Sequence, residues 1–279
     1  MPITLDYSSK LILITGGGRG IGYAIARALA SAGATLALTY TSKDCSEVAA
    51  ALEHEFGITV KTFKAEASDS ADTDRLVADV EAAFGKKVDI AIANAGVALW
   101  KDAHAMTDDD FKRLFEVNTY GPYYLSRALV RSWLDLPIGV DPSAAQPDIK
   151  SITRKLGKQI LIVSSISGLV AMSPQRQAAY NASKAAVTML SKSLAEEWAH
   201  LGVTVNTISP GYVATDMVSS GDPKLAEWSK EWTYRTPVGK FASAADLGQF
   251  VALLVSDQQG GWGFFTGSDV VVDGGYTTL

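Results

Sequence analysis

The sequence contains one cysteine, three histidines and no long run of apolar residues. With Cys45 alone, the chain can form neither an intramolecular disulfide nor a cysteine-clustered zinc site, which fits a reducing compartment. His54, His104 and His200 are scattered without the spacing of metal ligands, so we expect no metal site. No stretch approaches the roughly 20 apolar residues that span a bilayer, and no charged leader precedes an apolar run at the start. These absences predict a cytoplasmic protein with no membrane contact.

Clustered positive charge is also lacking. The formal net charge is −5, and no block of lysine and arginine gathers on any predicted helix, so a nucleic-acid partner has little support. Apolar residues, in contrast, make up 47% of the 279 positions, which is typical of a globular protein with a large core. We predict a single domain over residues 1–279.

Short apolar runs rich in strand-forming residues alternate with helical patterns along the chain. Seven such runs predict an α/β fold, a doubly wound (Rossmann-type) seven-stranded parallel sheet with helices on both faces. The predicted strands are Leu11–Thr15, Thr35–Tyr40, Thr59–Lys64, Val88–Ala93, Gln159–Ser164, Thr204–Ser209 and Asp269–Val272.

Two segments interrupt this alternation. Residues 135–158 carry three prolines ahead of the fifth strand, and we interpret them as a surface insertion. Ser219–Lys240 contains Trp228, Trp232 and Tyr234, a density of aromatic side chains typical of a substrate lid, which we place around residues 212–240. The alternative is a helix pair that packs these rings into a local core.

A glycine-rich motif follows the first strand directly. Gly16, Gly20 and Gly22 stand just before the helical pattern Tyr23–Ala32. Without Cβ atoms the backbone can approach a pyrophosphate closely, and the free N–H groups and dipole of the helix stabilise its charge. A tight strand-to-helix turn is the structural alternative, but the position after the first strand favours a dinucleotide site.

Tyr180 and Lys184 lie four residues apart at the start of a helical stretch that runs to His200. Residues at this spacing share one helix face, so their side chains can meet. A phenol is a poor acid–base group at neutral pH, but a nearby ammonium favours the phenolate and lowers the pKa of the tyrosine. Taken alone, such a pair is common on helix surfaces.

The glycine spacing resembles that of the short-chain dehydrogenase/reductase family. The resemblance continues in order over residues 11–275 through Asn94-Ala95-Gly96, Asn118, Ser165, Tyr180 with Lys184, and Pro210-Gly211. It implies an enzyme that moves a hydride between a nicotinamide and a carbonyl or alcohol carbon. It also implies a homotetramer built partly from the helices that carry Asn118 and Tyr180.

The same resemblance assigns the catalytic roles. Tyr180 would give its proton to the carbonyl oxygen, and Lys184 would hold the nicotinamide ribose. Asn118, in the predicted helix Phe111–Leu129, would kink that helix and hold a water in a proton relay to the lysine. Its alternative is an amide that satisfies local backbone groups.

Three serines compete for the remaining role, a hydrogen-bond donor to the oxygen on which negative charge grows. Ser165 stands three residues before Gly168, as the family's catalytic serine does. Ser167 matches the usual separation from the tyrosine better, and Ser164 is also near. We favour Ser165, because the turn after a strand fixes side-chain direction more tightly than a loop of variable length does.

The resemblance also provides a set of cofactor-binding positions. After the third strand the acidic residue near the adenine is Glu66, where the family more often has Asp followed by a branched residue. Thr215 would bind the nicotinamide carboxamide, with the backbone of Val213 beside it. The complete set is Gly16, Arg19, Gly20, Ile21, Gly22, Tyr40, Thr41, Ser42, Glu66, Ala67, Asn94, Ala95, Gly96, Tyr180, Lys184, Pro210, Gly211, Val213 and Thr215.

The expected cofactor is NADP(H). Enzymes that use NAD place a carboxylate after the second strand to bind the adenosine ribose. Here no carboxylate follows that strand until Asp44, which we expect to point into the next helix. Arg19, Ser42 and Lys43 form a plausible cradle for the 2′-phosphate instead, although Arg19 packing on the adenine is the alternative.

Within the family, the motifs look most like the fungal and yeast branch that reduces ketoses such as sorbose, fructose and xylulose, and in some members aryl ketones. Trp100, Tyr212, Trp228 and Trp232 could stack on a sugar or an aryl ring. A second hypothesis is a bulkier secondary metabolite, admitted by the insertion at 135–158. A third, a catalytically silent nucleotide sensor, is disfavoured because it would not need Asn118, Ser165, Tyr180 and Lys184 together.

Overall fold

The computed structural model describes residues 4–139, 148–152, 155–215, 223–256 and 264–278. Its centre is a seven-stranded sheet with the order β3-β2-β1-β4-β5-β6-β9, in which every pairing is parallel. The strands are β1 Leu11–Ile14, β2 Thr35–Tyr40, β3 Val60–Lys64, β4 Ile90–Ala93, β5 Lys158–Val163, β6 Val203–Pro210 and β9 Asp269–Val272. The sheet confirms the predicted fold class, and each predicted strand is present with its ends shifted by two residues or fewer.

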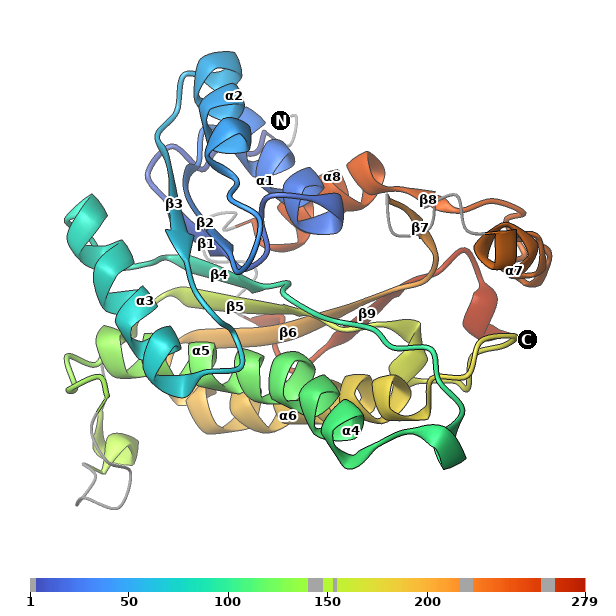
Figure 1. The fold of residues 1–279 in the computed structure, drawn as a ribbon. Helices are drawn as coiled ribbons and strands as arrows, with labels where there is room; N and C mark the ends of the chain where they lie inside the picture. Colours follow the sequence, from blue (N-terminus) through green and yellow to red (C-terminus); the bar gives the residue numbers. More distant parts are fainter. Residues whose placement is uncertain (1–3, 140–147, 153–154, 216–222, 257–263, 279) are drawn as a thin grey trace.

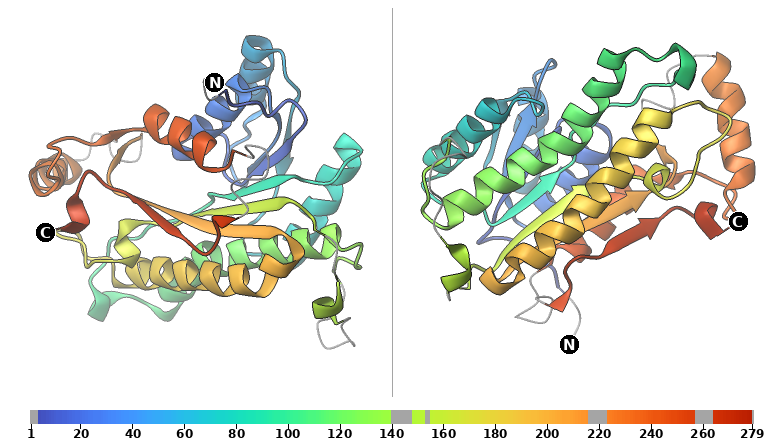
Figure 2. Two further views of the ribbon diagram at one scale, coloured as in Figure 1. Left: turned by 180° about the vertical axis from the view of Figure 1, so that it is seen from behind. Right: turned by 90° about the horizontal axis from the view of Figure 1, so that it is seen from below.

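Helices cover both faces of this sheet (Figures 1 and 2). One face carries α1 Gly20–Ser31, α2 Ser46–Phe56 and α8 Ala244–Leu254, and the other carries α3 Ser70–Phe84, α4 Asp108–Phe115, α5 Gly121–Trp133 and α6 Ala178–Trp198. α7 Pro223–Arg235 lies off the carboxyl edge of the sheet. The shorter helical turns are η1 Ala103–Ala105, η2 Glu116–Tyr120, η3 Ile149–Ser151, η4 Ile166–Gly168, η5 Ala199–Leu201 and η7 Tyr276–Thr278.

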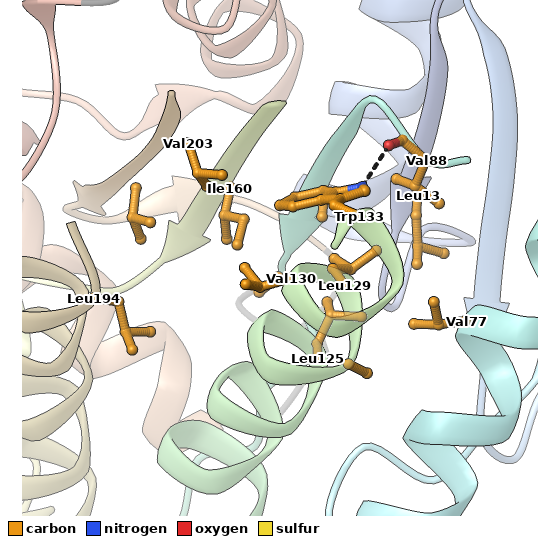
Figure 3. Packing of buried hydrophobic residues seen from close by; sticks show 14 of the residues in the cluster. Leu13, Val77, Val88, Leu125, Leu129, Val130, Trp133, Ile160, Leu194 and Val203 are labelled. Atoms are coloured by element: carbon orange, nitrogen blue, oxygen red, sulfur yellow. Dashed lines mark hydrogen bonds between the residues drawn. The ribbon is translucent and has the colours of Figure 1, made fainter. Parts of the chain in front are cut away.

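Each face of the sheet has its own hydrophobic core. Leu11 and Leu13 of β1 join the core under α3, α5 and α6, whereas Ile12 and Ile14 join the core under α1, α2 and α8. Figure 3 shows the first of these cores, where the buried Trp133 indole of α5 donates a hydrogen bond to the Val88 carbonyl (2.8 Å). Burial on both faces explains why the strands are continuous apolar runs rather than alternating ones.

The strand order reverses between β1 and β4. The chain first adds β2 and β3 on one side of β1, and then returns to add β4 and the later strands on its other side. In open parallel sheets, ligands bind outside the carboxyl ends of the strands at such a point. The glycine motif after β1 and the Asn94-Ala95-Gly96 motif after β4 both lie there.

A second, two-stranded parallel sheet was not predicted. β7 Val213–Ala214 pairs with β8 Ala242–Ser243, and the Ala242 amide donates to the Tyr212 carbonyl (2.9 Å). These short strands bring together the two ends of the segment that contains α7. Two-residue strands are too short to show an alternating pattern in the sequence.

The insertion precedes β5, so it lies at the amino edge of the sheet, opposite to α7 (Figure 1). Ile149, Ile152 and Leu156 pack against the hydrophobic core beneath α5 and α6. Residues 140–147 and 153–154 of this segment lie outside the described residues. The described part of the insertion thus lies at the edge of the sheet opposite to the glycine turn, because the loop before a strand and the loop after it lie at opposite edges of a parallel sheet.

Over the described ranges, no helix combines the length and the hydropathy needed to cross a bilayer.

Candidate active site

The turn between β1 and α1 depends on glycine at three positions. Gly16 and Gly20 have φ angles of +64° and +54°, in the left-handed region that glycine adopts without strain. A Cβ on Gly22 would lie 2.2 Å from the Gly16 carbonyl oxygen, so no larger residue fits there without moving the turn. The spacing of the motif therefore follows from the backbone path.

Thr15 connects this turn to the motif after β4. Its hydroxyl oxygen accepts hydrogen bonds from the backbone amides of Asn94 and Ala95, both at 3.0 Å. The Asn94 side-chain amide donates in return to the carbonyls of Thr15 (3.0 Å) and Gly16 (3.2 Å). Thr15 was not among the predicted site residues, although a threonine between a buried strand and a glycine turn was the available indication.

A pocket opens between the carboxyl ends of β1, β2, β3 and β4. Ala67 lines it, but Glu66 is not among its lining residues. The Glu66 carboxylate accepts a hydrogen bond from the Ser68 hydroxyl (2.8 Å) and lies 3.9 Å from the Arg113 guanidinium. The lining residues are Thr15, Gly16, Thr39, Tyr40, Thr41, Ala65, Ala67, Thr73, Leu76, Ala93, Ala95, Gly121, Pro122 and Leu125.

The surface beside this pocket carries cations without ion pairs. Arg19, the exposed N-cap residue of α1, and Lys43 have no ion-pair partner among the residues that the structure describes. Asp44 does point into the next helix, as expected: its carboxylate accepts from the amide (3.0 Å) and hydroxyl (3.1 Å) of Ser46, the first residue of α2. The only nearby carboxylate of this loop is thus already engaged.

The Pro210-Gly211 motif ends β6 on the other side of the glycine turn. A Cβ on Gly211 would lie 2.8 Å from the Asp273 Cα, so glycine is required where this loop meets the C-terminal segment. A Cβ on Gly20 would lie 3.7 Å from the Thr215 side chain. The Thr215 side chain therefore lies beside the glycine turn, whereas Val213 is buried in the hydrophobic core of that face of the sheet.

Tyr180 and Lys184 lie in the first two turns of α6. The Lys184 ammonium is buried, donates to the Val163 carbonyl (2.8 Å) and lies 5.8 Å from the centre of the Tyr180 ring. Burial lowers the pKa of Lys184 to about 8. Burial also raises the pKa of Tyr180, and the hydrogen bond with Ser165 is the smaller, opposing effect. This is opposite to the lowering expected from a neighbouring ammonium.

The three candidate serines have different surroundings. Ser165 lies close enough to the Tyr180 side chain to oppose the rise in its pKa, and the Ser165 hydroxyl oxygen accepts a hydrogen bond from the Ser167 amide (3.1 Å). The Ser167 hydroxyl is buried and accepts from the Gln177 side chain (3.0 Å). Ser164 is tied to α6 through the Lys184 carbonyl (3.1 Å) and the Thr188 hydroxyl (2.7 Å). Of the three serines, only Ser165 influences the pKa of Tyr180.

Gly168 explains why a glycine follows this serine three residues later. A Cβ on Gly168 would lie 2.8 Å from the Ala185 nitrogen and 2.8 Å from the Lys184 carbonyl carbon. The η4 turn therefore packs directly on the α6 backbone beside Lys184. This close approach brings Ser165 within reach of Tyr180.

Asn118 lies in η2, a π-helical turn between α4 and α5. The buried side chain is bonded at both ends to Val97, accepting from its amide and donating to its carbonyl, each at 2.9 Å. It also donates to the Ser183 hydroxyl (3.1 Å). A π-helical turn inserts an extra residue into a helix, which accounts for the interruption expected in Phe111–Leu129.

Aromatic side chains gather beside this site, but two of them form a local core. Trp232 is 2% exposed and stacks on Tyr212 with ring centres 4.5 Å apart. Trp100, at 37% exposed, meets Trp228 edge to face at 5.5 Å. Trp232 is therefore packed into a local core, as the alternative to a substrate lid predicted. Trp100 and the half-buried Trp228 remain accessible, and Tyr234 is 86% exposed. Residues 216–222 of the predicted lid lie outside the described residues.

No group of three or more potential metal ligands occurs among the described residues.

Comparison with known proteins places this site in context. The sequence profile of the short chain dehydrogenase family matches residues 10–226. The chain is 35% identical over 271 residues to a sorbose reductase of Candida albicans, covering 96% of this chain and 87% of that protein. It is 35% identical over 274 residues to an NADP-dependent mannitol dehydrogenase of Hypocrea jecorina, covering 96% and 92%. The structure of an NADPH-dependent 3-quinuclidinone reductase from Rhodotorula rubra matches with a TM-score of 0.82 and 29% identity, covering 99% and 94%.

Proposed function

The chain belongs to the short-chain dehydrogenase/reductase family, and from that membership we propose that it is an NADPH-dependent reductase of ketoses and related ketones, which also oxidises the matching polyol or alcohol. One observation carries the proposal. Tyr180 lies beside Ser165 and 5.8 Å from the buried Lys184 ammonium, at the sheet edge that also carries the glycine turn. Sorbose reductase and NADP-dependent mannitol dehydrogenases among the similar proteins support the substrate class.

The residues fit a dinucleotide. A Cβ at position 22 would collide with the Gly16 carbonyl. Because glycine has no Cβ, the turn can stay tight and leave the backbone amides at the start of α1 open to a pyrophosphate. The pocket lined by Tyr40, Thr41 and Ala67 would take the adenine, and Thr215, beside the glycine turn, would contact the nicotinamide. NADPH, when bound there, supplies the hydride.

The protein's own groups would handle the oxygen and its proton. The Ser167 amide occupies an acceptor site of the Ser165 hydroxyl, so the Ser165 proton is directed away from the backbone. Ser165 would donate it to the carbonyl oxygen, in the manner of an oxyanion-hole donor. Tyr180 would deliver its phenolic proton to the same oxygen, with Lys184 and Asn118 beside it.

A preference for NADPH over NADH rests on charge. Arg19 and Lys43 have no ion-pair partner in the described part of the chain, and the Asp44 carboxylate is bonded to Ser46. A 2′-phosphate would meet two cations and no competing carboxylate. The names of the fungal relatives, NADP-dependent mannitol dehydrogenases, support the same cofactor.

The test is a panel assay of the purified protein. NADPH oxidation is followed with ketoses, aryl ketones and quinones under identical conditions, and NADP reduction with the corresponding polyols. We expect the highest kcat/KM with a ketose. Tyr180→Phe serves as the control, with turnover reduced at least about a hundredfold and cofactor binding retained. Turnover of none of these carbonyls, or full activity of the variant, would contradict the proposal.

An aryl or bicyclic ketone is the second candidate substrate, favoured by the accessible Trp100–Trp228 pair and the structural similarity to the 3-quinuclidinone reductase.

We further propose a cytoplasmic homotetramer. Exposed apolar side chains on α4, η2, α5 and α6, namely Phe111, Tyr120, Tyr123 and Met189, support association through these helices.

A further inference from the structure

Gln175 is a buried polar residue to which the sequence analysis gave no role. It lies five residues before Tyr180, in the loop between η4 and α6, and is only 4% exposed. Its carbonyl oxygen accepts a hydrogen bond from the Trp232 indole (2.7 Å). Its amide nitrogen donates to the Tyr212 hydroxyl (2.9 Å).

The chemistry of the two partners fixes the orientation of the amide. An indole N–H can only donate, so it requires the carbonyl end of Gln175, and the NH₂ end is left for the Tyr212 oxygen. A side chain of this length that both accepts and donates is needed here. Burial makes both contacts costly to lose, because each would leave an unpaired polar group.

These contacts join three segments that are far apart in sequence. Trp232 belongs to α7, Tyr212 follows the Pro210-Gly211 motif, and Gln175 precedes the catalytic helix α6. Trp232 also packs against the accessible pair, with ring centres 5.9 Å from Trp228 and 6.4 Å from Trp100. The placement of that pair therefore depends on how Trp232 is held.

We propose that Gln175 is a positioning residue for substrate recognition, which fixes α7 and the Tyr212 loop relative to the catalytic helix through its two hydrogen bonds. This inference rests on the proposed function. Gln175 contacts neither Ser165 nor Lys184 in the hydrogen bonds of the described chain, so its loss should weaken substrate binding far more than hydride transfer or cofactor binding.

The experiment compares Gln175→Met, which keeps the length and removes both hydrogen bonds, with Tyr212→Phe, which removes only the hydroxyl, and with the double variant. Gln249→Met, the same change at an exposed position of α8, is the matched control. For the best ketone of the panel, we expect Gln175→Met to raise KM about tenfold, with kcat and the NADPH dissociation constant changed by less than about threefold. Tyr212→Phe should raise KM less, and the double variant no more than Gln175→Met alone.

A second readout does not depend on which ketone is reduced. The Trp232 indole N–H, assigned by NMR with Trp232→Phe, should exchange slowly in the native protein and at least about tenfold faster in Gln175→Met. Strictly additive effects on KM, or a loss of kcat and of NADPH affinity that accompanies the rise in KM, would show a general structural role and overturn the inference. If no ketone is turned over but the exchange rate changes as expected, the proposed function fails while the contact itself stands. Unchanged exchange of the Trp232 N–H in Gln175→Met overturns the inference. If Gln175→Met is too unstable for kinetics, KM is measured for Tyr212→Phe instead, and an unchanged KM overturns the inference as well.

Discussion

The ammonium of Lys184 is buried, and it donates a hydrogen bond to the Val163 carbonyl rather than to a carboxylate. Its pKa is lowered to about 8 by burial, so the folded protein binds fewer protons than the unfolded chain between about pH 8 and the ordinary lysine value of 10.5. The free energy of unfolding therefore rises with pH across this window, and the cost of the buried charge is fully present below it.

Lys184→Met should consequently stabilise the cofactor-free protein at pH 7 by up to about 3 kcal/mol while it abolishes activity. Denaturant unfolding of both proteins at several pH values measures this effect. The difference should shrink as the pH rises from about 8 to 10.5. A variant that is less stable than the native protein at pH 7 would show that the Val163 contact outweighs the cost of desolvation.

The serines give a prediction that separates two neighbouring hydroxyls. Ser165→Ala should reduce kcat by about a hundredfold or more, the effect of removing one oxyanion donor. Ser167→Ala should cost much less, because its hydroxyl is bonded to Gln177 while its backbone amide, which holds Ser165, is kept. Single-turnover kinetics with both variants measure the difference, and the reverse order would assign the donor to Ser167.

Arg19→Ala tests the proposed phosphate cradle. Because the guanidinium makes no ion pair in the described structure, its removal should leave stability unchanged and weaken NADPH binding at least about tenfold. NADH binding should change by less than about twofold. Cofactor titrations by fluorescence give both constants, and an equal loss for the two cofactors would mean that Arg19 packs on the adenine instead.

At the scale of elements, the proposed catalytic geometry depends on how η4 packs on α6. Gly168→Ala places a methyl group 2.8 Å from backbone atoms of both Lys184 and Ala185, and backbone cannot move aside as a flexible side chain does. We expect a loss of about 1–3 kcal/mol in stability and a fall in kcat that exceeds the rise in KM. Chemical denaturation and steady-state kinetics check the two parts. A variant with native kcat would show that Ser165 keeps its place when η4 shifts.

Elements with a long periodic pattern were predictable from the sequence. The strands, the glycine turn and the start of α6 are dictated by local residue patterns, and the structure places them as expected. The π-helical turn at Glu116–Tyr120 and the β7–β8 pair were not predictable, because both depend on contacts between distant segments, such as Asn118 with Val97. The burial of Trp232 was undecided for the same reason: its partner Gln175 lies 57 residues away.

At the scale of the whole molecule, the sheet separates the insertion from the site. Ile149→Ala removes apolar contact from a side chain that packs on the core at the amino edge. It should lower the free energy of unfolding by about 1–2 kcal/mol, and it should leave kcat and the KM values for the ketone and for NADPH unchanged. Thermal unfolding and steady-state kinetics are the measurements. A changed KM for the ketone would support the hypothesis that the insertion at 135–158 admits a bulkier substrate.

The pairing of β7 with β8 has a consequence for how such an enzyme can diversify. It clamps the two ends of residues 215–241 side by side, while the seven-stranded sheet and the glycine turn lie outside the clamp. A whole segment carrying α7 can then be exchanged between homologues as one cassette, with splice points at Val213 and Ser243, provided that the threonine at position 215 beside the glycine turn is kept. Such a transplant would carry the partner of Gln175 with it, so cassettes that keep a tryptophan at position 232 should transfer substrate preference most faithfully.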